Sequence, residues 1–129
     1  MLKKSLAVAA ATGMLALGST TALAASKSTQ LSNGVLTISA DDGCTVSGNC
    51  GLYYSATTYK KTGGSTVTVQ LAMTTGNALY TDSLKSISAG QTLSKSWGGL
   101  RKSDTADCTI AGYMKASTGN YYTPNLNVC

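Results

Sequence analysis

The segment STVTVQLAM, residues 65–73, alternates apolar and polar side chains. Successive side chains of a β-strand point to opposite faces, so this alternation is the pattern of a half-buried strand. The apolar face consists of Val67, Val69, Leu71 and Met73, and the polar face of Thr66, Thr68 and Gln70. The segment therefore predicts a strand that covers one side of a core.

The same alternation recurs in other segments. Residues 34–40 place Leu36, Ile38 and Ala40 on one face, and residues 108–116 place Cys108, Ile110, Gly112 and Met114 on one face and Thr109, Tyr113 and Lys115 on the other. Further strands are expected near 52–59, 79–88, 91–97 and 121–128. Turn-forming pairs such as Asn33-Gly34 and Gly63-Gly64 separate these segments.

Short alternating strands with frequent turns favour an all-β fold, and no segment after residue 24 has a sustained helical period. We expect a small antiparallel β-sandwich of immunoglobulin-like size, with a small barrel as the alternative. The predicted organisation is a signal peptide at 1–24, a flexible polar leader at 25–33 and a single β-sandwich domain at 34–129.

The first 24 residues have the three-part pattern of a secretory signal peptide. Lys3 and Lys4 precede an apolar run at 6–17, and Ala22 and Ala24 supply small residues at a cleavage site. The apolar run is too short to span a bilayer core of about 30 Å. We expect a secreted, extracellular protein, cleaved after Ala24, whose mature form does not insert stably into a membrane.

The charge of the chain is modest. Removal of Lys3 and Lys4 lowers the formal net charge from +5 by two, to +3, and the remaining basic residues form no block. Nucleic-acid-binding proteins are usually far more basic, with the charge clustered on one surface. We therefore expect no nucleic-acid partner.

Four cysteines in an exported chain predict two disulfides. The expected pairing is sequential, with Cys44 bonded to Cys50 and Cys108 to Cys129, and Cys108 is expected to point into the core. A zinc site would need paired short cysteine spacings or histidines, and the sequence has no histidine. We expect no metal and no cofactor.

The acidic residues offer little for catalysis. The chain has no glutamate and five aspartates, and without histidine it cannot form a Ser-His-Asp triad. Asp41 and Asp42 are adjacent, so on a strand they would point to opposite faces. Asp104 and Asp107 are expected to form turns or to pair with Arg101 or Lys102. The chain is predicted not to be an enzyme.

Tyrosine replaces phenylalanine entirely, with seven tyrosines and no phenylalanine. If Leu52 faces the core, then Tyr53, Tyr59 and Lys61 project outward, and tyrosine beside small polar residues is common at protein-recognition surfaces. The alternative is that tyrosines merely suit half-exposed strands. Trp97 either covers the rim of the core from an edge strand or lies exposed as a stacking platform.

Three functions fit this sequence. The first is a non-catalytic protein-interaction module, such as a subunit or adaptor of an extracellular, toxin-like complex, in which residues 25–33 add a strand to another secreted protein. The second is a carbohydrate- or cell-wall-binding module that contacts a cell-surface glycan through Trp97 and outward tyrosines. The third is a secreted protease inhibitor or antibacterial protein that displays residues 44–50.

Overall fold

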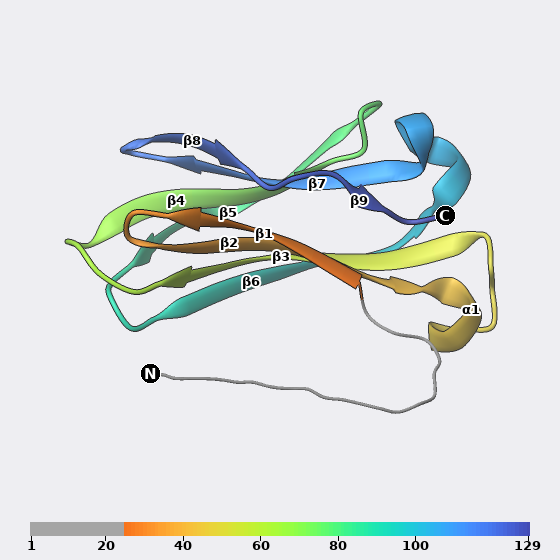
Figure 1. Ribbon diagram of the computed structural model, residues 1–129, viewed down its shortest axis with the longest axis horizontal. Helices are drawn as coiled ribbons and strands as arrows, with labels where there is room; N and C mark the ends of the chain where they lie inside the picture. Colours follow the sequence, from red (N-terminus) through yellow and green to blue (C-terminus); the bar gives the residue numbers. More distant parts are fainter. Residues whose placement is uncertain (1–24) are drawn as a thin grey trace.

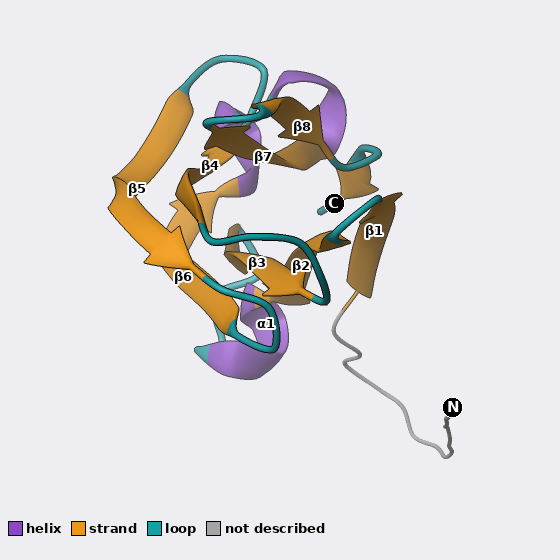
Figure 2. Cartoon of the chain, turned by 90° about the vertical axis from the view of Figure 1, so that its left-hand side faces the viewer, coloured by secondary structure: helices purple, strands orange, loops and turns teal. Residues whose placement is uncertain are grey.

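The computed structural model describes residues 25–129, so the predicted signal peptide lies outside the described residues. Strands form two antiparallel sheets that lie one above the other in Figure 1. Figure 2 views the same arrangement at 90° and shows β5 and β6 side by side where one sheet meets the other. The predicted all-β sandwich with two disulfides is confirmed.

Each sheet follows a simple strand order. Sheet A has the order β1-β2-β3-β6, with β1 at Ala25–Leu31, β2 at Gly34–Asp42, β3 at Leu52–Lys61 and β6 at Thr92–Arg101. Sheet B has the order β5-β4-β7-β8, with β5 at Leu79–Ile87, β4 at Val67–Thr74, β7 at Thr109–Ala116 and β8 at Gly119–Tyr122, while β9 (Leu126–Asn127) pairs with β7. The connections contain three short helices, α1 (Gly43–Val46), η1 (Lys102–Asp104) and η2 (Ala106–Cys108).

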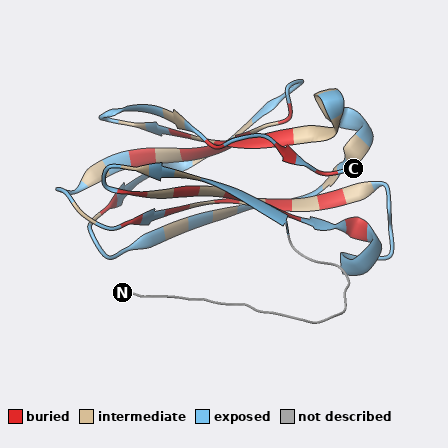
Figure 3. Cartoon of the chain, viewed as in Figure 1, coloured by how far each residue is buried: buried red, intermediate tan, exposed pale blue. Residues whose placement is uncertain are grey.

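The core lies between the inner faces of the sheets, where the buried residues of Figure 3 line up. The apolar faces predicted for β2, β4 and β7 all point inward, since Leu36, Ile38, Val69, Leu71, Met73, Ile110 and Met114 are buried. A Cβ built on Gly112 would lie 3.2 Å from the Cβ of Ile38 in the opposite sheet. Gly112 therefore lets the two sheets approach closely.

Two segments differ from the sequence prediction, one at residues 121–128 and the other at residues 25–33. The strand expected near 121–128 is divided, because β8 ends at Tyr122 and β9 begins at Leu126, with Pro124 between them. Proline has no backbone N–H and interrupts a ladder at this point.

The flexible leader predicted at 25–33 is a second correction. Residues 25–31 form strand β1, which pairs with β2 in continuous register from Ala25 opposite Ala40 to Leu31 opposite Gly34. Because β1 is an edge strand and mostly exposed, its sequence needs no alternating apolar face. Backbone hydrogen bonds to β2, rather than burial of apolar side chains, define this strand.

Both edges of sheet A carry a lysine on the core-facing side. In β1, Lys27 lies opposite the buried Ile38, and in β6, Lys95 lies opposite the buried Thr57. Paired residues of antiparallel strands share a face, so both lysines point toward the side that sheet B covers. A charge in this position disfavours the addition of a further strand to the edge.

Candidate functional site

The predicted recognition residues of β3 face the core, and that prediction is wrong. Tyr53, Tyr59 and Lys61 are all buried. The register explains the orientation, because Tyr59 lies opposite Leu36, whose side chain is fully buried. Leu52 is the first residue of the strand and lies opposite the exposed Arg101, so it faces outward and does not indicate the inner face.

Trp97 is half-buried and packs against the core, as in the rim-covering alternative. Its Nε1 donates a hydrogen bond to Oγ1 of Thr57 at 3.0 Å, and the same Oγ1 donates to the carbonyl of Ala72 at 2.8 Å. Its ring centroid lies 6.4 Å from that of Tyr80. These contacts hold the indole of β6 against Thr57 of β3 and Tyr80 of β5, so the exposed stacking platform is not present at Trp97.

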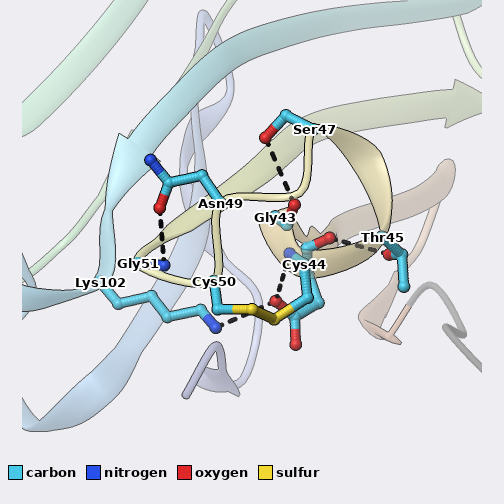
Figure 4. Close-up of a disulfide and its surroundings, with 9 residues drawn as sticks. Gly43, Cys44, Thr45, Ser47, Asn49, Cys50, Gly51 and Lys102 are labelled. Atoms are coloured by element: carbon cyan, nitrogen blue, oxygen red, sulfur yellow. Dashed lines mark hydrogen bonds and ion pairs between the residues drawn. A yellow bond between two sulfur atoms is a disulfide. The ribbon is translucent and has the colours of Figure 1, made fainter.

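The first disulfide joins Cys44 to Cys50, as predicted, and closes a compact loop (Figure 4). Oδ1 of Asp42 accepts a hydrogen bond from the Cys44 N–H at 3.0 Å and lies 3.1 Å from Nζ of Lys102. These donors hold the pKa of the Asp42 carboxyl below its ordinary value, with the Cys44 hydrogen bond as the larger cause. The loop is a crosslinked structural element.

The second predicted disulfide, between Cys108 and Cys129, is also confirmed. Cys108 lies in η2 with φ of 58° and is half-buried, so it does not point into the core as expected. The N–H of Val128 donates to the Cys108 carbonyl at 2.9 Å. This bridge therefore attaches the last residues of the chain beside β7.

Three of the five aspartates, including Asp42, form ion pairs. Asp104 pairs with Arg101 at 3.1 Å, as expected, and Asp82 pairs with Lys85 at 2.6 Å. The Lys85 ammonium is the first cause of a lowered Asp82 pKa. Within residues 25–129, no group of three or more His, Cys, Asp or Glu side chains could hold a metal ion.

Exposed apolar side chains lie on the outer face of sheet B, two of them on the edge strand β5 and one on the opposite edge strand β8. Four large hydrophobic residues among the described residues are exposed: Val46 (51%), Leu79 (57%), Leu84 (67%) and Tyr122 (57%). Leu84 lies opposite Gln70, Leu79 opposite Thr74, and Tyr122 opposite Tyr113, all at outward positions of β4 and β7. Three of the four exposed residues therefore share one face, whereas Val46 lies in α1.

A pair of stacked tyrosines, on β7 and the edge strand β8, lies on this face. The rings of Tyr113 and Tyr122 lie with their centroids 4.5 Å apart and their planes at 17°. The pKa of Tyr113 is raised by burial and by the neighbouring Tyr122. We call the outward surface formed by Gln70, Leu79, Leu84, Tyr113, Lys115 and Tyr122 the tyrosine face.

Two shallow hollows lie on either side of Tyr113 along β7. One has a volume of about 340 Å³ and is lined by Gln70, Leu84 and Lys115 together with residues of β4 and the β7–β8 turn. The other has a volume of about 200 Å³ and includes Thr74 and Ala111 in its lining. The tyrosine face thus combines exposed apolar groups, concave surface and one lysine.

The outer face of sheet A has a different chemistry. A row of hydroxyl side chains crosses all four strands at Ser28, Thr37, Thr58 and Ser94, which are opposite one another in the register. The oxygens of Ser28 and Thr37 lie 2.8 Å apart, and those of Thr58 and Ser94 lie 3.0 Å apart. None of the exposed large hydrophobic residues of the described chain lies on this face.

The sequence carries a signal for part of the tyrosine face. The alternation in residues 108–116 placed Tyr113 and Lys115 on the side away from the core, which the structure confirms.

No helix within residues 25–129 combines the length and hydropathy needed to cross a bilayer. The chain matches no protein-family model, no curated protein and no solved structure.

Proposed function

We propose that the chain is a secreted, non-catalytic interaction module that binds another extracellular protein through the tyrosine face. The observation that carries this proposal is the location of three of the four exposed large hydrophobic side chains on that one face. Exposed large apolar residues that share one face of a small protein favour an interaction site, and tyrosine is enriched in such sites. The two hollows beside the tyrosines provide space for side chains of a partner.

The strand edges support binding through a face rather than through strand addition. Residues 25–31 already form β1 of the protein's own sheet, and Lys27 and Lys95 oppose a further strand at either edge of sheet A. The strand-adding tail that the sequence favoured is therefore no part of the proposal.

The secreted location has two supports. The chain has two disulfides, and disulfides form and persist in oxidising, extracellular-type environments. The first 24 residues have the sequence pattern of a signal peptide, which predicts export to such an environment.

Affinity purification from the culture fluid of the producing cells tests the proposal. The wild-type protein is expected to retain one stoichiometric partner, identified by mass spectrometry. Leu84→Lys and Tyr122→Ser should each weaken the measured affinity by about tenfold or more, as at a binding hot spot. Val46→Lys is the matched control, since Val46 is equally exposed but lies outside the tyrosine face.

The proposal fails if the partner binds the two tyrosine-face variants as tightly as it binds the wild type. It also fails if only Val46→Lys weakens binding. Denaturant unfolding of every variant, followed by the fluorescence of the single tryptophan, separates lost binding from lost folding.

Carbohydrate binding is the second candidate, now centred on Tyr122 instead of Trp97. The exposed Tyr122 ring lies on β8 on the same outward face as the amide side chain of Asn120, and aromatic rings with amide groups suit sugar recognition. A polysaccharide pull-down that retains the wild type and Trp97→Phe but loses Tyr122→Ala would favour this candidate over protein binding. For a protease inhibitor, the Cys44–Cys50 loop offers no favourable feature, because it begins with the helical turn α1.

A further inference from the structure

Lys61, the last residue of β3, is buried between the two sheets with 1% of its surface exposed. The alternation of β3 requires this inward orientation, since Tyr59 and Thr57 precede it on the same buried face. Lysine is almost never fully buried without a partner, because removing an ammonium group from water is costly. The position therefore calls for an explanation of how the charge is compensated.

The ammonium group of Lys61 has one recorded acceptor. Its Nζ donates a hydrogen bond to the carbonyl of Gly63 at 2.6 Å. An ammonium group carries three donors, so two remain. The ion pairs within residues 25–129 join Lys85 to Asp82, Arg101 to Asp104, and Lys102 to Asp42, and none of them includes Lys61.

A small cavity adjoins this lysine at the end of the sandwich near the β1–β2 turn. Its volume is about 40 Å³, and its lining includes Asn33, Tyr59, Lys61 and Tyr121. On the same measure a single water needs about 10–15 Å³. The space accepts a monoatomic ion or a few waters, and it excludes a sugar ring or an amino-acid side chain.

Polar groups of the lining suit an anion. Tyr59 and Tyr121 line the cavity. The Tyr59 hydroxyl donates its hydrogen to the Asn33 carbonyl at 3.4 Å, whereas the Tyr121 hydroxyl lies 3.1 Å from Oγ1 of Thr118 and can accept from it, which leaves its own hydrogen for the cavity. Burial and the neighbouring Tyr121 raise the pKa of Tyr59, so this hydroxyl stays neutral and adds no negative charge beside Lys61. No carboxylate side chain lies in the lining to repel negative charge.

We propose that Lys61 and this cavity form a binding site for one small monovalent inorganic anion of halide size. The ammonium group supplies the opposite charge and two free donors, the Tyr121 hydroxyl can supply one more, and the cavity volume sets the size limit. Asn33 and Ser32, which are exposed, line the mouth and give the ion access from solvent. The site is separate from the tyrosine face, because it lies between the sheets rather than on the outer face of sheet B.

Thermal unfolding of the mature chain in sodium bromide and in sodium gluconate, at equal ionic strength and pH 7, tests the site. Gluconate is too large for the cavity. A ligand that binds only the folded state raises the midpoint with concentration, by about 5–10 °C at ten times its dissociation constant for a domain of this size. We expect this rise for the wild type in bromide and not in gluconate.

Lys61→Met should remove the difference between the two salts. Lys60→Met is the matched control, because Lys60 is exposed and adjacent, and it should behave as the wild type does. Equal midpoints of the wild type in the two salts would overturn the proposal, as would a bromide-specific rise that survives in Lys61→Met.

A second measurement requires no variant. Crystals of the wild-type protein grown in sodium bromide should show an anomalous bromide peak within hydrogen-bonding distance of Nζ of Lys61. Water alone in the cavity at saturating bromide would refute the anion site even if Lys61→Met fails to fold.

Discussion

Thr57 provides the sharpest test of how the two sheets are held together. Its Oγ1 accepts a hydrogen bond from Nε1 of Trp97 and donates one to the carbonyl of Ala72, and the residue has 0% of its surface exposed. Thr57→Val keeps the shape of the side chain and removes both bonds. Each buried hydrogen bond contributes about 0.5–1.5 kcal/mol, so the expected loss of unfolding free energy is about 1–3 kcal/mol.

Such a loss lowers the unfolding midpoint of a domain of this size by roughly 5–20 °C. Guanidinium unfolding followed by circular dichroism measures the free energy directly. Thr58→Val is the matched control, because Thr58 is the neighbouring residue on the outer face and bonds only to Ser94 in exposed surroundings. It should change the free energy by no more than about 0.5 kcal/mol.

A double-mutant cycle with Trp97→Phe isolates the contact between the two side chains. Once Trp97 has lost its N–H, Thr57→Val should cost about 0.5–1.5 kcal/mol less than it does in the wild type. Additive effects of the two substitutions would show that the Thr57–Trp97 bond within sheet A contributes nothing. An effect of Thr57→Val no larger than that of Thr58→Val would show that the bond from Thr57 to Ala72 does not hold the sheets together.

Three further predictions concern crosslinks and titration. Replacing both cysteines of the bridge that ends at Cys129 should cost about 1 kcal/mol more unfolding free energy than replacing both cysteines of the bridge at Cys44, because the closed loops span sequence separations of 21 and 6; equal losses in denaturant unfolding would contradict this ranking. Burial raises the pKa of Tyr53 from 10.0 to about 12, so the stabilising contribution of its neutral form is complete below pH 10 and is lost as the pH rises toward 12. Tyr53→Phe should therefore retain more stability than the wild type at pH 11, and identical alkaline unfolding curves would refute the assignment. The Asp42 pKa is lowered by the Cys44 N–H and Lys102, so its contribution is present above the ordinary value of 3.8 and is lost as the pH falls below it. Asp42→Asn should flatten acid unfolding monitored by tryptophan fluorescence, whereas an unchanged acid profile would count against the contribution of this carboxylate.

The inner faces of β2, β4 and β7 could be predicted because their alternation is unambiguous. In β4 the apolar residues, such as Leu71 and Met73, alternate with polar residues such as Gln70. Only the apolar face can therefore be buried in the core. The two disulfides could also be predicted, since the sequential pairing closes loops that strand ends and turns can accommodate.

The orientation of β3 could not be predicted from its own residues. Tyr53 and Tyr54 are adjacent tyrosines that take opposite faces, and the buried face also includes the small polar residues Ser55 and Thr57. Only the register with β2 assigns the faces, because it places Tyr59 opposite the buried Leu36. Such a pairing between strands is a property of the assembled sheet rather than of the local sequence.

The location of the candidate site was missed for a related reason. Leu79 and Leu84 lie on β5, where the register shifts between the pairs formed by Gln70 and Ala72, so the alternation is broken. The placement of these leucines on the same face as Tyr113 and Tyr122 depends on which strands become neighbours in sheet B, and no single segment of the sequence specifies the order β5-β4-β7-β8.

The hydroxyl row across sheet A has a consequence for how the module would work. The hydroxyl groups of this row bond to one another, at Ser28–Thr37 and at Thr58–Ser94. Fewer hydrogen-bonding groups therefore remain for a second partner. Under the proposed function, the molecule is adhesive on one side only. A protein that binds with one face covers the surface of its target and leaves its other face, here the hydroxyl-lined face of sheet A, in contact with solvent. It would therefore cap one target and not crosslink two.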